Sequence, residues 1–302
     1  MLNTEFTSKF VKEGLTFDDV LLIPAESHVL PSQVDISTHL TKKIKLNTPI
    51  MTAAMDTVTE ADMAIAIARE GGIGIIHKNM SIERQADQVD MVKRSENGVI
   101  VDPFFLAPEN TVREADNLMG RYKISGVPIC ENGKLVGIIT NRDLRFESDP
   151  NRRVDEVMTR MPLVTAPAGV SREHAANLLA KHKVEKLPLV DDDGRLSGLI
   201  TVKDFVKTQQ YPKASKDSKG RLIVGAGVGY LSDSWERAAL LADAGVDVLV
   251  IDSANGEARL ALDMIRRLRA DSGFDGVQII GGNVATQSGA QALIDAGVDG
   301  LV

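Results

Sequence analysis

The chain has 302 residues, 43% of them hydrophobic and 4% aromatic, which exceeds one ordinary domain of about 100–200 residues and predicts two. Its formal net charge of −7 argues against a nucleic-acid-binding surface, where Lys and Arg are usually concentrated. The single cysteine excludes an intrachain disulfide, no apolar run approaches the roughly 20 residues of a membrane span, and the amino terminus lacks a signal-peptide core, so we expect a soluble, cytoplasmic protein.

Residues 1–93 are expected to form the first part of a β/α domain. A strand-like stretch at 48–55 is followed by a helix and then by a glycine-rich strand at 71–77. Thr59 is placed to cap the helix and Gly71 to end it. A strand, a helix and a strand in this order favour a parallel pair joined by a crossover.

Residues 94–209 contain an internal repeat with an offset of about 60 residues, which indicates duplicated domains at 94–153 and 154–209. Thr111 opens the first copy, with a glutamate three residues on, and this is the pattern of a helix capping box. Ser171 opens the second copy at the equivalent place, with His174 three residues on. In each copy the helix is followed by a strand with a proline, a turn and a second strand.

A hydroxyl and a carboxylate stand three residues apart where the second strand of each copy ends. Such a pair can hold the phosphate and ribose of a nucleotide, assisted by helix-end amides and a neighbouring cation. The alternative is that each pair only caps its helix, but its duplication at equivalent places favours binding. The candidate residues are Thr140, Arg142 and Asp143 in the first copy and Thr201, Lys203 and Asp204 in the second.

β–α alternation returns from about residue 210 and continues to 302. The Lys-, Ser- and Gln-rich segment at 205–220 is expected to be a linker that leads back into it. Apolar stretches there predict buried parallel strands with short exit loops, at 221–229, 246–252 and 277–280. The glycines at 225–229 have GxGxG spacing and not the GxGxxG spacing of a dinucleotide fingerprint. The pattern fits an α/β barrel or a doubly wound sheet, and the repeat is inserted into it.

Residues at strand ends are the candidates for chemistry, because β/α barrels carry their sites at the carboxyl ends of their strands. The candidates are Met55, Asp56, His77, Asp252, Ser253 and Asn283. Asp252 follows an apolar strand, where a carboxylate can accept hydrogen bonds from ribose hydroxyls. Alternatively it caps the next helix. His77 fits a ligand contact or a buried structural histidine equally well, and Asn283, which follows two glycines, fits a site residue or a turn.

Five stretches together resemble the inosine monophosphate dehydrogenases, namely 15–22, 53–60, 71–79, 252–256 and 281–286. The repeat resembles a tandem CBS (Bateman) pair, inserted where that family carries it. The resemblance covers essentially the whole chain and implies an α/β fold, a (β/α)8 TIM barrel that is incomplete within these residues. In this reading 1–93 and 210–302 belong to the barrel. Guanosine monophosphate reductase is similar in the barrel but normally lacks the insert, and so ranks lower.

The resemblance implies NAD-dependent oxidation of inosine monophosphate to xanthosine monophosphate, the committed step of guanine nucleotide synthesis. It implies that purine nucleotides, ATP or GTP with magnesium, bind the CBS pair and regulate the enzyme. A homotetramer that can pair into octamers is also implied, with no nucleic-acid or membrane partner. The residues that the resemblance assigns to the cofactor are Asp252, Ser253 and His77, and those that it assigns to the substrate pocket are Met55, Asn283, Gly281 and Gly282.

The nucleophilic cysteine of this family would lie beyond Val302, as would its potassium site and its mobile flap. Cys130 lies in the repeat and is not expected to be that nucleophile. About five barrel strands and the start of a sixth are expected, where a closed barrel has eight. We therefore expect no catalytic residue and no metal ligand in these 302 residues, and no turnover by them alone. The second reading is a regulatory module that senses nucleotides through the CBS pair.

Overall fold

The computed structural model describes residues 14–95, 100, 103–202, 205 and 210–302, and the chain divides into two units, Met1–Ile36 and Ser37–Val302. The described part of the first unit contains two short 3-10 helices, η1 (Phe17–Asp19) and η2 (Pro31–Gln33). The second unit contains the sheets and the candidate sites. Among the described residues, no helix combines the length and the apolar character needed to cross a membrane.

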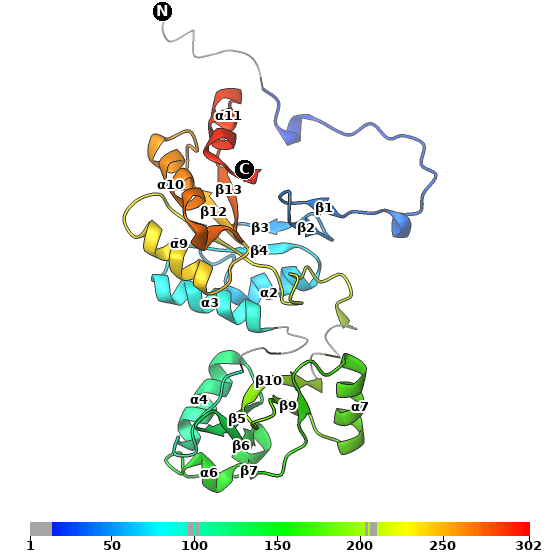
Figure 1. Ribbon diagram of the computed structural model, residues 1–302. Helices are drawn as coiled ribbons and strands as arrows, with labels where there is room; N and C mark the ends of the chain where they lie inside the picture. Colours follow the sequence, from blue (N-terminus) through cyan, green and yellow to red (C-terminus); the bar gives the residue numbers. More distant parts are fainter. Residues whose placement is uncertain (1–13, 96–99, 101–102, 203–204, 206–209) are drawn as a thin grey trace, which may run out of the picture. The chain divides into compact units, whose positions relative to one another are not determined.

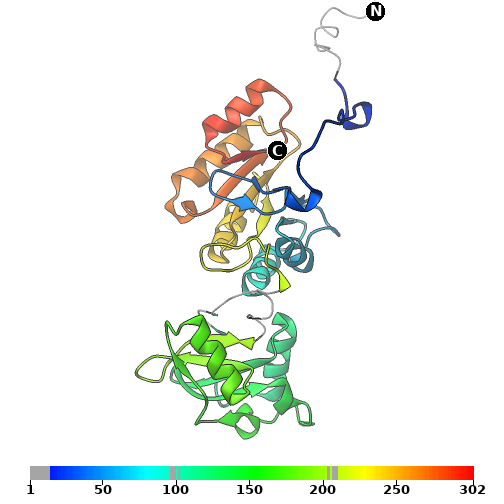
Figure 2. The same ribbon diagram turned by 90° about the vertical axis from the view of Figure 1, so that its right-hand side faces the viewer.

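Six parallel strands form the main sheet of the second unit, in the spatial order β14-β13-β12-β11-β4-β3. This order follows the chain without a reversal, whereas a doubly wound sheet reverses its strand order near the middle. The sheet therefore has the winding of a barrel, and it curls as Figures 1 and 2 show. Its elements are β3 (Met51–Thr52), α2 (Ala61–Arg69), β4 (Ile73–Ile76), α3 (Ile82–Ser95), β11 (Gly225–Val228), α9 (Ser234–Asp243), β12 (Val248–Asp252), α10 (Arg259–Ala270), η3 (Ser272–Phe274), β13 (Gln278–Gly282), α11 (Gln287–Ala296) and β14 (Gly300–Leu301).

The two faces of this sheet are both apolar, as expected for parallel strands that are covered on both sides. Along β12, Val248 and Val250 point to one core with residues of β4 and β13, while Leu249 and Ile251 point to a second core. The second core is larger and includes apolar residues of α2, α3, α9, α10 and α11. These helices therefore cover the outer face, and the first core fills the inner face.

A small hairpin packs against the inner core. It consists of β1 (Thr38–His39) and β2 (Lys45–Leu46), which pair antiparallel. Leu46 is buried among the inner-face residues, and the buried hydroxyl of Thr41 donates a 2.9 Å hydrogen bond to Oε1 of Gln278 at the start of β13. Because Gln278 begins its strand, the hairpin lies at the amino-terminal end of the sheet, opposite the end where site residues are expected.

The insert consists of two similar α/β units, each with its own sheet and core. The first contains the sheet β5-β6-β7 and the second the sheet β8-β9-β10. The backbone repeats with the sequence: Lys123 and Lys183, 60 residues apart, both end their helices in the left-handed conformation, with φ of 52° and 53°. The elements are α4 (Val112–Tyr122), β5 (Gly126–Glu131), β6 (Lys134–Thr140), α5 (Asn141–Leu144), α6 (Val154–Val157), β7 (Thr159–Arg160), β8 (Ala166–Pro167), α7 (Arg172–His182), β9 (Lys186–Val190) and β10 (Leu196–Thr201).

The predicted caps of the repeat are confirmed. The backbone N–H of Glu114 donates to the Thr111 hydroxyl at 3.3 Å, and the Glu114 carboxylate accepts from the Thr111 backbone at 2.6 Å. Hydrogen bonds from Thr111 accordingly hold the pKa of Glu114 below its usual value. In the second copy the N–H of His174 donates to the hydroxyl of Ser171.

The predicted cap at Thr59 is wrong. Helix α2 begins at Ala61 after Glu60, and the buried hydroxyl of Thr59 donates instead to the carbonyl of Ala53 at 2.7 Å. The prediction for the other end is confirmed, because Gly71 has a φ of +94° and its N–H donates to a carbonyl in the last turn of α2. Thr59 closes the loop before the helix and not the helix itself.

The segment expected to be a linker is, where it is described, part of the barrel unit. Ser215 is buried, its N–H donates to Ala68 at 2.8 Å and its hydroxyl donates to Gly71 at 2.6 Å. Ala68 lies in the last turn of α2, and Gly71 lies between α2 and β4. The polar composition was misleading because the serine satisfies the carbonyls left free at the end of α2.

Candidate functional site

The predicted site residues of the barrel come together at the carboxyl end of the sheet. Asp252 ends β12 and pairs in register with Gly282, the last residue of β13. The N–H and hydroxyl of Ser253 both donate to the carbonyl of Gly282, at 3.1 Å and 2.8 Å, and the N–H of Asn283 donates to Ser253 at 2.7 Å. These bonds continue the β12–β13 pairing past the strands and fix where the polar side chains emerge.

Asp252 and Asn283 are accessible from this end, whereas Ser253 is buried and its hydroxyl is engaged. The carboxylate of Asp252 is about half exposed and forms an ion pair with Lys78, whose Nζ lies 3.1 Å from Oδ2. Lys78 also donates to the Asp252 carbonyl at 3.1 Å. The carboxylate is thus held in place while part of it faces solvent.

His77 follows β4 and is 2% exposed, so the alternative of a buried histidine describes it well. The N–H of Asn79 donates to Nδ1 at 3.1 Å, which places the ring proton on Nε2. Nε2 in turn faces carboxylate oxygens of Glu60 at 3.4 Å and Asp56 at 3.6 Å. Any ligand contact by the imidazole would have to compete with these two carboxylates.

Met55 is 59% exposed on the loop after β3, at the same end of the sheet. Gly281 and Gly282 are buried in β13, and their missing side chains have a packing reason: a Cβ at Gly282 would collide with the backbone of Val302. Gly282 therefore lets the backbone after β14 approach β13 closely, whereas a Cβ at Gly281 would meet the side chains of Leu293 and Val298.

Several polar residues around this site were not singled out from the sequence. They are Glu60, Lys78, Asn79 and Arg84. Their signal was position, because Glu60 lies between β3 and α2, while Lys78 and Asn79 follow β4. Asp56, a candidate from the sequence, lies beside them on the loop after β3. Within the residues that the structure describes, no three His, Cys, Asp or Glu side chains form a group that could hold a metal ion.

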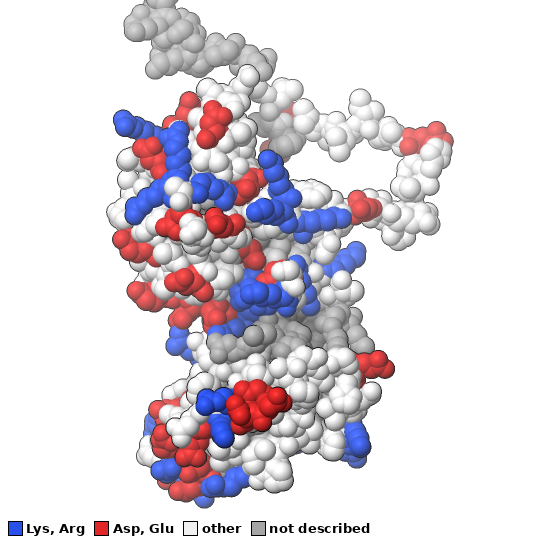
Figure 3. All heavy atoms as spheres, viewed as in Figure 1, with Lys and Arg blue, Asp and Glu red and all other residues white. Residues whose placement is uncertain are grey.

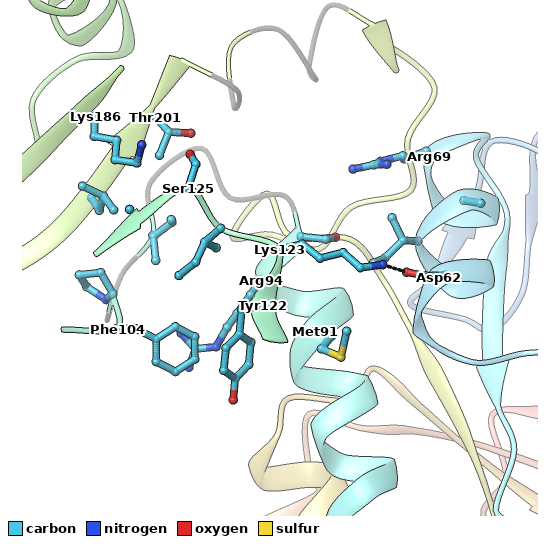
Figure 4. Close-up of a pocket in the computed structure, with 18 residues that line it drawn as sticks. Asp62, Arg69, Met91, Arg94, Phe104, Tyr122, Lys123, Ser125, Lys186 and Thr201 are labelled. Atoms are coloured by element: carbon cyan, nitrogen blue, oxygen red, sulfur yellow. Dashed lines mark hydrogen bonds and ion pairs between the residues drawn. The ribbon is translucent and has the colours of Figure 1, made fainter. Parts of the chain in front are cut away.

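Residues that are equivalent in the internal repeat of the insert line two different cavities. The first, of about 370 Å³, is lined by Thr140, Arg142 and Asp143 together with 184–186. The second, of about 310 Å³, is lined by Thr201 together with 124–126, the segment 60 residues earlier, and also by residues of α2 and α3, among them Arg69 and Met91. Figure 4 shows Ser125, Lys186 and Thr201 on one side of this second cavity. Lys203 and Asp204, predicted here, lie outside the described residues.

In the first cavity, Thr140 and Asp143 fit both alternatives, the helix cap and the nucleotide site. The N–H and hydroxyl of Thr140 each donate to Oδ2 of Asp143 at 2.7 Å, so the pair does cap α5. Both residues also line the cavity. Lys186, which the sequence analysis missed, is 8% exposed and lines both cavities.

Cys130 lies on β5 and is 4% exposed. Burial raises the pKa of its thiol to about 11, so the thiol is neutral at physiological pH. A thiol in this state is a poor nucleophile.

The chain matches the family described as "IMP dehydrogenase / GMP reductase domain" over residues 14–302. It is 62% identical over 296 residues to an inosine-5'-monophosphate dehydrogenase of Bifidobacterium longum (strain NCC 2705), covering 97% of the chain and 54% of that relative. It is 59% identical over 299 residues to one of Streptococcus pyogenes, covering 98% of the chain and 60% of that relative. The chain thus spans 54% to 60% of the length of these curated relatives.

Among solved structures, a GMP reductase from Trypanosoma brucei in complex with guanosine 5'-triphosphate matches with a TM-score of 0.88 and 40% identity. The match covers 98% of this chain and 72% of that chain, so it includes the insert. The insert therefore does not by itself separate dehydrogenase from reductase, although we expected it to. Sequence and structure together show that the chain belongs to the IMP dehydrogenase / GMP reductase family.

Proposed function

We propose that the protein oxidises inosine monophosphate to xanthosine monophosphate at the carboxyl end of the curled sheet, with NAD as the hydride acceptor. The observation that carries this proposal is the identity of 57% to 62% with inosine-5'-monophosphate dehydrogenases, against 40% with the matching GMP reductase. GMP reduction is the second candidate, since that reductase shares the fold over nearly the whole chain.

The residues at this end fit a dinucleotide cofactor. Asp252 presents a partly exposed carboxylate, which can accept hydrogen bonds from the two hydroxyls of a ribose. Lys78 holds this carboxylate, and Ser253 keeps the ends of β12 and β13 together. NAD, when bound, would supply the hydride acceptor. A carboxylate in this place also disfavours the additional phosphate of NADP, since like charges repel.

The substrate nucleotide is assigned to the Met55 and Asn283 side of the same end. Both residues are exposed and lie on loops that directly follow strands, β3 and β13. Met55 offers an apolar surface for a purine ring, and Asn283 offers both a donor and an acceptor. His77 supports this region from beneath through the carboxylates that it faces.

The insert is proposed to be a CBS pair that binds ATP or GTP with magnesium and regulates the enzyme. Its support is that equivalent residues of the two repeat copies, including a threonine at a strand end in each, line two cavities, the second of which α2 and α3 also line. We place the two CBS domains at 94–153 and 154–209, between barrel segments 1–93 and 210–302. A homotetramer is proposed on the family resemblance, and the mass in solution tests it.

The activity test uses the protein as its gene encodes it. Formation of NADH that requires inosine monophosphate would support the dehydrogenase, and Asp252→Asn should weaken it. Consumption of NADPH that requires guanosine monophosphate, with no NADH formed from inosine monophosphate, would replace this function by the reductase.

Nucleotide binding by the insert is tested by titrating the protein with ATP and magnesium in a calorimeter. Arg142→Gln should lower the ATP affinity, because Arg142 lines the first cavity. Arg113→Gln is the matched control, because Arg113 is exposed on α4 and does not line that cavity. If neither ATP nor GTP binds saturably, the regulatory role is excluded.

A further inference from the structure

The loop between β3 and α2 has an unusual backbone at Thr57. Its φ is +61°, in the left-handed region that glycine favours and that β-branched residues rarely adopt. Such a conformation persists only where the surroundings hold it, and it is common next to functional sites. Met55, assigned above to the substrate, lies two residues before Thr57 on this loop.

Asp56 makes the contacts that hold this loop. Its Oδ1 accepts from the Thr57 N–H at 2.9 Å, and its Oδ2 accepts from Nδ2 of Asn79 at 2.7 Å. Asn79 lies on the segment after β4, so the second bond ties two strand exits together. Thr59, buried beneath, closes the same loop through its bond to Ala53.

His77 and Glu60 complete the support from below. Since Nδ1 of His77 accepts from the Asn79 N–H, Nε2 carries the proton and faces Asp56 and Glu60. Glu60 is also held by Arg84, at 3.1 Å. Both oxygens of Asp56 are therefore engaged within the protein, although its side chain is 55% exposed.

We propose that Asp56 is a positioning residue for the substrate nucleotide, which fixes the loop that carries Met55 through its bonds to Thr57 and Asn79. The proposal rests on the proposed function. According to this proposal, Asp56 does not contact the substrate itself. It acts on substrate binding through the place of Met55, and the effect is expected in KM for inosine monophosphate more than in kcat.

The test exploits the fact that Asp56 accepts and Asn79 donates. Asn79→Asp sets two carboxylates against each other and should raise KM for inosine monophosphate roughly tenfold, about the effect of losing one hydrogen bond to a charged group. Adding Asp56→Asn to this variant restores one donor and one acceptor with their roles exchanged. The double variant should return to within about threefold of the unmodified KM, since only the direction of the bond has changed. Glu83→Gln, at an exposed position on α3, is the control.

Kinetics and direct binding of inosine monophosphate are both measured on the protein as its gene encodes it, with thermal unfolding as the check on folding. Unmodified protein that binds the nucleotide without NADH formation would refute the proposed reaction and still allow this comparison by calorimetry. The proposal is overturned if Asn79→Asp lowers the melting temperature but leaves KM and affinity unchanged. It is also overturned if the folded double variant is no better than the single one. If the unmodified protein does not bind inosine monophosphate, both proposals fail.

Discussion

At the scale of single residues, Lys78 and Asp252 have different roles in the proposed cofactor site. Lys78 holds the carboxylate from one side, and the remaining acceptor capacity of Asp252 is available to a ribose. Exposed ion pairs contribute only about 0–1 kcal/mol, so Lys78 should matter less than the carboxylate that it positions.

We therefore predict that Asp252→Asn raises KM for NAD at least about tenfold, because a hydrogen bond to a charged group contributes about 1.5–3 kcal/mol. Lys78→Met should raise it only a few-fold, by about the strength of an exposed pair. Lys78→Arg keeps the charge and should be close to the unmodified enzyme. Steady-state kinetics with varied NAD test this order, and a larger effect of Lys78→Met than of Asp252→Asn would contradict the assignment.

Cys130 is predicted to react slowly with alkylating reagents, because its thiol is buried. Its pKa in the folded chain is about 11, against an ordinary value of 9.0. At pH 8 the folded thiol should then react with iodoacetamide roughly 100-fold more slowly than in the urea-unfolded chain, from ionisation alone. Because folding raises this pKa, the thiol is neutral in both states below about pH 9 and stability does not depend on its ionisation there. As the pH rises from 9 to 11 the thiol ionises in the unfolded chain before it does in the folded one, so the free energy of unfolding falls. Equal labelling rates at pH 8 in both states would contradict the burial.

At the scale of elements, the sequence predicted correctly those helix caps that depend only on contacts within the first turn of the helix. The caps at Thr111 and Ser171 are satisfied within their own first turns, so the sequence carried the whole signal. Thr59 was predicted to be a third cap but belongs to the loop before α2. This loop is bonded to the residue that follows β4, since the His77 N–H donates to the Thr59 carbonyl at 3.4 Å. That contact spans 18 residues, and no helix-start pattern contains it.

The candidate site was predictable to the same extent. Parallel strands share one carboxyl edge, so the prediction that His77, Asp252 and Asn283 lie at one end needed only the order of the elements. The pairing of Lys78 with Asp252 depends on how far β4 and β12 extend past β11, the strand between them. Periodicity does not encode that distance. The same limit applies to Nε2 of His77, which faces Glu60 on a separate segment.

At the scale of the whole molecule, most charges lie on the surface, where acidic and basic side chains are interspersed over the face in Figure 3. Lys93 at the end of α3 is different because it is 2% exposed. Its Nζ lies 2.6 Å from Asp247, 3.1 Å from Asp217 and 3.0 Å from the carbonyl of Leu222. Asp217 and Asp247 lie 124 and 154 residues after Lys93 in the chain, so three distant segments meet at one ammonium group.

The two carboxylates respond differently to this shared cation. Burial raises the pKa of Asp247, and the attraction of Lys93 only partly offsets it. Burial acts the same way on Asp217, but hydrogen bonds from Arg221 and the charge of Lys93 outweigh it and lower the pKa. Asp217 belongs to the segment that returns from the insert, and α3 is the last helix before the insert. The ammonium group therefore fastens both barrel ends of the insert to the start of β12.

Removing this cation should be among the most damaging substitutions in the barrel. Lys93→Met leaves two partly buried carboxylates without their partner, and breaking a buried pair in this way costs about 3–5 kcal/mol of unfolding free energy. Lys181→Met, at an exposed position on α7, should change stability by less than about 0.5 kcal/mol. Adding Asp247→Asn to Lys93→Met removes one of the uncompensated charges and should recover part of the loss. Urea unfolding at neutral pH measures all three variants. A Lys93→Met loss no larger than that of Lys181→Met would mean that water reaches these charges and that the three segments are held together by apolar packing alone.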